Sequence, residues 1–108
     1  MNTVSADSRK GWSVNVADRV AVLEIALLNW TYLLPWNQFV YAEGGGDEVH
    51  AVFATHEVIV RGAGLTALLA DLAAQIVTLI QEPTRADRFQ SSGDRFIRDV
   101  VVRKNEAG

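Results

Sequence analysis

The 108-residue sequence contains no cysteine and only two prolines. Without thiols, the chain has no disulfide bridge, no cysteine nucleophile and no zinc site built on cysteine, and this composition is typical of a reducing compartment. Hydrophobic residues make up 49% of the chain, which is enough to bury a core and excludes global disorder. The length suits one domain and is too short for two independent cores.

Neither a secretory signal nor a membrane span is expected from the sequence. The opening "MNTVSADSRKGW" is polar and carries acid as well as base. The apolar run at residues 20–36 is interrupted by Glu24, Asn29 and Pro35, and it is shorter than the roughly 20 residues that a spanning helix needs. We therefore expect a cytoplasmic protein that does not enter a membrane.

Basic residues are concentrated near the C-terminal end of the chain. The net charge is −3, but residues 85–104 carry six basic and three acidic side chains, so this segment is positive and the rest is strongly negative. A clustered basic segment attracts anions, and the interleaved aspartates weaken that field. The candidate anion-binding or nucleic-acid-binding residues are Arg85, Arg88, Arg95, Arg98, Arg103 and Lys104.

The N-terminal part of the chain is the hardest to assign. Residues 1–14 show little hydrophobic period and are predicted to be a flexible tail, followed by a single domain at 15–104 and a C-terminal tail at 105–108. Apolar residues in 16–28 recur at steps of three and four, as in a helix. The β-branched stretch "RVAVLEI" favours strands instead. We predict strands at about 19–27 and 30–34, with a helix over 16–28 as the alternative.

The middle of the chain alternates apolar and polar residues with a period of two. "FVYAE" and "VHAVFA" are predicted to pair as a hairpin whose tip is "GGGDE". Val49, Ala51 and Phe53 should face inward, with His50 on the opposite face. "HEVIVRG" is the next strand, joined through a turn at Thr55 or continuing as one long bent strand.

After residue 64 the period changes to that of a helix. Leucines at 65, 68, 69 and 72 fall on one stripe, which predicts an amphipathic helix over about 65–75. "IVTLI" favours a strand at 76–81, with a longer helix as the alternative, and "FIRDVVVRK" supplies the last strand. The predicted fold is α+β: a small antiparallel sheet, or a partly closed barrel, of five to six strands covered by one helix.

Few residues suggest catalysis. His50, His56 and Glu57 are weak metal candidates, because the H-x₅-H spacing matches no helical or loop zinc motif. No serine lies in a G-x-S-x-G motif, and the carboxylates are scattered singly. We therefore predict no catalytic residue, no metal and no cofactor.

Aromatic residues are the second feature that suggests binding. Five of them fall within twelve residues, a density that would suit a stacking platform for single-stranded nucleic acid if a basic groove lay beside it. No arginine or lysine lies between Arg19 and Arg61, so a core with a subunit interface is the favoured interpretation. These interface candidates are Trp30, Tyr32, Trp36, Phe39 and Tyr41.

Two resemblances follow from these segments. "LLPWNQFVYAEG", "VFATHEVIVRGAGLTALLADLAAQIVTLIQE" and "FIRDVVVR" resemble a family of small uncharacterised bacterial proteins over roughly residues 20–103, which implies no activity. "FVYAEGGGDEVHAVFATHEVIVRGAGLTALLADL" is locally similar to the LytTR-type DNA-binding domain, which presents a basic strand to DNA. This chain has "IVTLIQEP" at that place, which contains no basic residue, so the residues that would bind DNA are missing.

The sequence favours a non-enzymatic protein that acts through protein contacts as a homo-oligomer. A short, strand-rich and apolar chain has sheet edges to cover, and a second subunit is a common cover. The alternative is a nucleic-acid or anion-binding module that uses the arginine-rich C-terminal segment.

Overall fold

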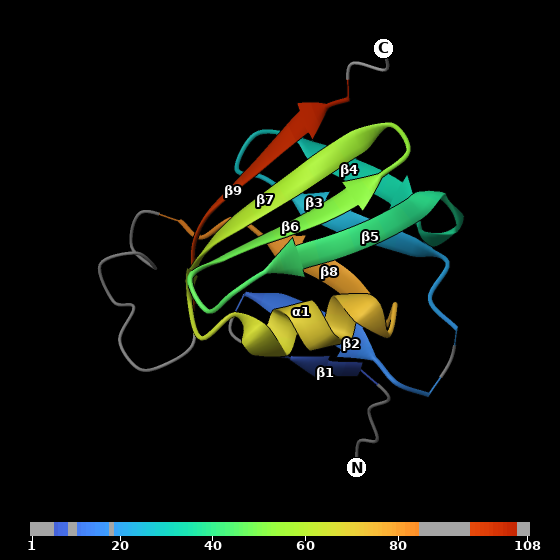
Figure 1. Cartoon of the computed structure of the whole chain (residues 1–108), viewed down its shortest axis with the longest axis horizontal. Helices are drawn as coiled ribbons and strands as arrows, with labels where there is room; N and C mark the ends of the chain where they lie inside the picture. Colours follow the sequence, from blue (N-terminus) through green and yellow to red (C-terminus); the bar gives the residue numbers. More distant parts are fainter. Residues whose placement is uncertain (1–5, 9–10, 18, 85–95, 106–108) are drawn as a thin grey trace.

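A computed structural model describes residues 6–8, 11–17, 19–84 and 96–105. In these residues the chain forms two β-sheets, one α-helix and one short 3-10 helix (Figure 1). The five-stranded sheet has the order β1 (Ala6–Ser8), β2 (Trp12–Asn15), β8 (Val77–Gln81), β3 (Val22–Ala26) and β4 (Thr31–Pro35). The four-stranded sheet has the order β5 (Phe39–Gly44), β6 (Glu48–Phe53), β7 (His56–Ala63) and β9 (Phe96–Lys104).

The two sheets correct the predicted architecture. The fold is α+β and mostly sheet, as expected, but it is not one sheet or barrel of five to six strands. The chain leaves the five-stranded sheet after Pro35, makes the 3-10 helix Trp36–Gln38, and enters the four-stranded sheet at Phe39. Because proline has no N–H to donate, Pro35 is a natural end for the first ladder. The strands pair antiparallel except for β3 and β8, which are parallel.

Several predicted elements are confirmed. The segment at 16–28 contains the strand β3, and no helix occurs in its described residues. Helix α1 spans Thr66–Ala73, within the predicted 65–75, and the following strand β8 replaces the longer helix. The connection between β6 and β7 is a turn at residues 54–55, so the single bent strand is wrong. In β6, buried and half-buried residues alternate as the period of two requires.

The predicted N-terminal tail is wrong for its second half. Residues 12–15 form β2, where Trp12 is 2% exposed and Val14 is fully buried. Trp12 pairs in register with Ile80, and Val14 with Val77. The short pattern "WSVN" already alternates apolar and polar residues, but four residues are too few to stand out beside a polar opening. The rest of the predicted tail lies partly outside the described residues.

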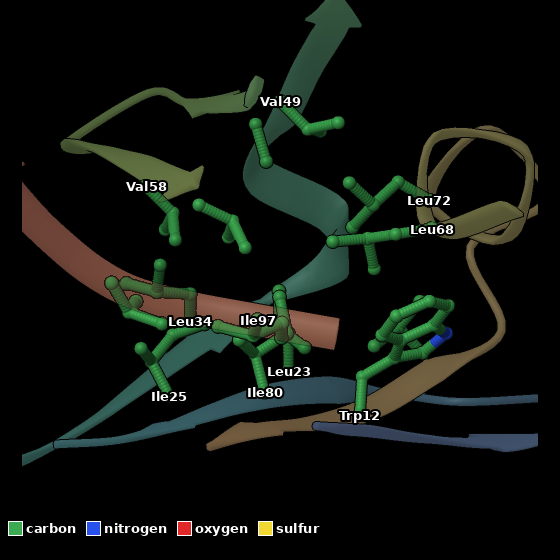
Figure 2. Close-up of a cluster of buried hydrophobic side chains, with 14 of the residues drawn as sticks. Trp12, Leu23, Ile25, Leu34, Val49, Val58, Leu68, Leu72, Ile80 and Ile97 are labelled. Atoms are coloured by element: carbon green, nitrogen blue, oxygen red, sulfur yellow. The ribbon is translucent and has the colours of Figure 1, made fainter. Parts of the chain in front are cut away.

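The core lies between the two sheets and beneath α1 (Figure 2). Side chains from the five-stranded sheet, such as Leu23 and Ile25, meet Val49 and Val58 from the other sheet. Leu68 and Leu72 add the buried stripe of α1, and Figure 2 shows them on the same side of the cluster as Trp12. The indole N–H of Trp12 also donates to a carboxylate oxygen of Asp71 at 2.9 Å, which ties α1 to β2.

A bulge sets the direction of side chains at the start of β9. The register between β7 and β9 shifts between Arg61 and Gly62, which turns Ile97 into the core with 3% exposure. The preceding residue, Phe96, is only half-buried. Gly62 is needed at this point because a Cβ atom there would collide with the carbonyl oxygen of Phe96.

Replacing Trp12 with alanine should lower the free energy of unfolding by about 3–5 kcal/mol, because it empties a fully buried aromatic site. Urea unfolding followed by circular dichroism measures this change. Tyr41→Ala is the control, since Tyr41 is an aromatic residue with 48% exposure and its loss should change stability by no more than about 0.5 kcal/mol. A loss below about 1 kcal/mol for Trp12→Ala would contradict the assignment of β2 to the core.

Candidate functional site

The outer face of the four-stranded sheet carries a histidine held between two glutamates. His50 Nε2 lies 2.6 Å from Glu48 Oε2, on the same strand β6. Its other ring nitrogen, Nδ1, lies 2.8 Å from Glu57 Oε2 on the neighbouring strand β7. The alternation of β6 puts all of its buried residues on the inner face, so residues 48 and 50 both project outward.

The geometry requires a protonated imidazole. An ionised carboxylate only accepts hydrogen bonds, so both ring nitrogens of His50 must donate. The hydrogen bond to Glu48 raises the pKa of His50 most strongly, and burial partly offsets this increase. The same contacts lower the pKa values of Glu48 and Glu57, chiefly through their hydrogen bonds to His50.

Two arginines extend this cluster into a network of alternating charge. Arg61 Nε donates to Glu48 at 3.2 Å, and Arg103 on β9 donates to Glu57 at 3.2 Å. Arg61 also lies 3.6 Å from a carboxylate oxygen of Asp99. The network therefore crosses β6, β7 and β9, and its charged groups are neutralised by one another. Each exposed ion pair of this kind contributes little to stability, and the face as a whole presents a charged, hydrated surface.

The three weak metal candidates do not converge. His50 and Glu57 are joined, but His56 Nδ1 lies 2.8 Å from the hydroxyl of Thr55 and its ring packs 5.5 Å from the ring of Tyr32. Within the ranges that the structure describes, no three histidine or carboxylate side chains have an arrangement that would hold a metal ion. Glu48 is the member of the cluster that sequence reasoning missed, although its i, i+2 spacing from His50 on a strand was a usable signal.

The basic segment is only partly described. Arg85, Arg88 and Arg95 lie outside the described residues. Of the other members, Arg103 pairs with Glu57, whereas Arg98 and Lys104 are exposed on β9. Anion or nucleic-acid binding through this segment stays a prediction.

The five aromatic interface candidates separate into core and surface. Trp36 is 4% exposed, packs against Phe39 and Phe53, and donates its indole N–H to the Val77 carbonyl at 3.1 Å. Trp36 is therefore a core residue, and Phe39 and Tyr32 are half-buried. Trp30 and Tyr41 remain at the surface, with 66% and 48% exposure.

Trp30 is one of several exposed apolar residues on the β3–β4 hairpin. The described residues contain eight exposed large hydrophobic side chains, and four of them come from this one hairpin: Val22, Leu28, Trp30 and Leu33. On the outer face of the sheet, Val22 lies opposite Pro35, and Leu33 lies opposite Glu24. This hairpin surface contrasts with the charged outer face of the other sheet.

Strand β4 is also an edge of its sheet. Leu27 N–H donates to the Trp30 carbonyl at 2.8 Å, and Trp36 N–H donates to the Ala21 carbonyl at 2.9 Å. In an antiparallel ladder, residues that face the partner strand alternate with residues that face away. The even-numbered residues 30–36 therefore face β3, and the backbone groups of Thr31, Leu33 and Pro35 face away from it. We call these three residues the β4 edge.

An open depression of about 560 Å³ lies near the end of α1. It is lined by Arg19, Val20, Ala21, Trp36, Asn37, Ala74, Gln75 and Ile76. Arg19 is the one charged side chain in this lining, and Asn37 and Gln75 are its other two polar side chains.

Comparison with protein-family models, with curated proteins and with solved structures finds no match to this chain. The two resemblances noted in the sequence stay predictions. In the part of the chain that the structure describes, there is no helix with the length and apolar character needed to cross a membrane.

The pKa of His50 should lie above its ordinary value of 6.5. A proton NMR titration of the imidazole C–H signals measures it directly. Glu48→Gln should lower this pKa more than Glu57→Gln does, because the bond to Glu48 contributes most. A pKa at or below 6.5, or the reverse order of the two variants, would contradict the arrangement described above.

The same contacts predict how stability depends on pH. Because the folded-state pKa of His50 is raised, its contribution is fully present below about pH 6.5 and is lost as the pH rises through the folded value. Glu48 and Glu57 have lowered pKa values, so their contribution is lost as the pH falls below about 4.5. His50→Gln should therefore destabilise the protein more at about pH 5.5 than at about pH 8.5, as measured by urea unfolding. An equal loss at both pH values would contradict this linkage.

Proposed function

We propose that this chain is a non-enzymatic interaction domain that assembles as a homo-oligomer through the β3–β4 hairpin. The observation that carries the proposal is the gathering of half of the exposed large hydrophobic side chains of the described residues on this one hairpin. Apolar groups exposed together on a soluble domain mark a contact surface more often than single scattered ones do.

The charge distribution supports the choice of surface. Thr31–Pro35 contains no charged residue, and Glu24 is the only charged residue of β3. The outer face of the four-stranded sheet, in contrast, carries His50 and its charged partners, which would be costly to remove from water. Burying the hairpin surface therefore costs less desolvation than burying the other face.

A second copy is the partner proposed here, because a surface with a single charged residue, Glu24, meets its own copy with little repulsion between like charges. A symmetric dimer buries the same patch on both subunits, so each exposed apolar side chain contributes twice. Trp30, with 66% exposure, supplies the large aromatic group that commonly dominates such interfaces.

Light scattering after size exclusion, over a range of protein concentrations, tests this proposal. The expected mass is about twice the 11.8 kDa of one chain at high concentration. Trp30→Ser should weaken self-association at least about tenfold, whereas Tyr41→Ser, which changes an exposed aromatic residue outside the hairpin, should change it less than about twofold. The mass of a single chain at every concentration would overturn the proposed function.

A further inference from the structure

We propose that two copies join edge to edge along β4, in antiparallel orientation, with the two-fold axis beside Leu33. This inference rests on the proposed function and specifies its geometry. The two five-stranded sheets would then continue into each other, in the order β3, β4, β4 of the second copy and β3 of the second copy.

The backbone groups of the β4 edge define the register. Thr31 and Leu33 each present an N–H and a carbonyl group away from β3, and Pro35 presents only a carbonyl group. With the axis beside Leu33, the two copies of Leu33 form a hydrogen-bonded pair. Thr31 then faces Pro35 of the second copy, and its N–H donates to the proline carbonyl. Every outward N–H of the strand obtains an acceptor, and the proline is placed where no donor is needed.

The side chains favour this register over a shifted one. It overlaps the strands along the whole of Thr31–Pro35 and brings together the two copies of Leu33, each 65% exposed in the single chain. A shift that pairs Thr31 with Leu33 would separate the leucines and extend the ladder into the turn at residues 28–29. Apolar residues directly opposite each other stabilise antiparallel pairs, so the unshifted register is preferred.

The other edges of the sheets are less suitable. Strand β9 is an edge that carries Arg98, Asp99, Arg103 and Lys104, and charges on an edge strand oppose pairing with another chain. Strand β5 is interrupted by a bulge between Phe39 and Tyr41, which also disfavours continuation. The short strand β1 spans only three residues. Among the described strands, β4 is the edge that has no charged residue and no bulge and spans more than three residues, and its one protective residue is Pro35 at its end.

Electrostatic repulsion does not oppose the pairing. Glu24 lies opposite Leu33 on β3, so the two copies of Glu24 would be three strand spacings apart in the joined sheet. At about 4.8 Å per spacing, this distance is about 14 Å. It exceeds the screening length of about 8 Å at physiological ionic strength.

Disulfide trapping tests the geometry, because the chain has no cysteine of its own. Leu33→Cys should form a covalent dimer under mild oxidation, since a hydrogen-bonded pair separates the Cα atoms by about 5.5 Å, which is within the range of disulfides once the two strands adjust to bring the Cβ atoms closer. Val40→Cys is the matched control: Val40 is 59% exposed on the edge strand β5, and it should stay monomeric on a denaturing gel. Cross-linking between Thr31→Cys and Leu33→Cys chains, without Leu33→Cys homodimers, would overturn the proposed register.

A charge substitution provides a readout that does not depend on oxidation. Leu33→Lys should raise the dissociation constant of the dimer at least about tenfold, because two ammonium groups would face each other at the axis. Val40→Lys should leave it unchanged within about twofold, and circular dichroism checks that both variants are folded. If the wild-type protein dimerises but Leu33→Lys does too, the β4 pairing is overturned while the proposed function stands. A monomeric wild-type protein overturns both.

Discussion

The structure depends on the packing of Trp36 at the point where the chain passes from one sheet to the other. Its indole ring packs against Phe39 and Phe53 of the four-stranded sheet, while its N–H donates to the Val77 carbonyl of the five-stranded sheet. Its backbone N–H also closes the β3–β4 ladder through the Ala21 carbonyl. Trp36 therefore both ends the β3–β4 ladder and packs between the two sheets. The two sheets face each other because this junction fixes the change of direction after Pro35.

The inner faces of both sheets pack into the shared core, whereas their outer faces differ in charge and hydrophobicity. In the four-stranded sheet, the outer face is neutralised by the alternating charges around His50, with Ile59 only 4% exposed on the strand between β6 and β9. The arginine and glutamate side chains there satisfy each other and remain hydrated. Among the residues that the structure describes, no such network covers the outer face near β4. The two outer faces therefore differ in character, one covered by paired charges and the other, near β4, largely apolar.

The sequence predicted individual strands and the helix better than it predicted how the strands pair into sheets. The alternation in "VHAVFA" and the leucine stripe of α1 each depend on neighbouring residues, so both were correct. The pairing of β3 with β8 joins segments that are more than fifty residues apart, and no local period specifies it. The contact between His50 and Glu57 was not predicted, because it depends on the pairing of β6 with β7 and not on a spacing within one segment. Trp36 was placed at an interface because composition alone does not distinguish a core aromatic residue from a surface one.

The position of Pro35 explains why an exposed edge is tolerable in this fold. Proline on an edge strand usually opposes pairing because it offers no N–H. At the end of Thr31–Pro35, however, it blocks only pairings that need a donor at that place. An antiparallel copy centred on Leu33 needs an acceptor there, whereas many shifted or longer pairings would leave a partner carbonyl without a donor. The same residue that ends the strand inside one chain thus restricts which neighbouring strand can be added, and a restricted edge gives a defined pair in place of open-ended aggregation.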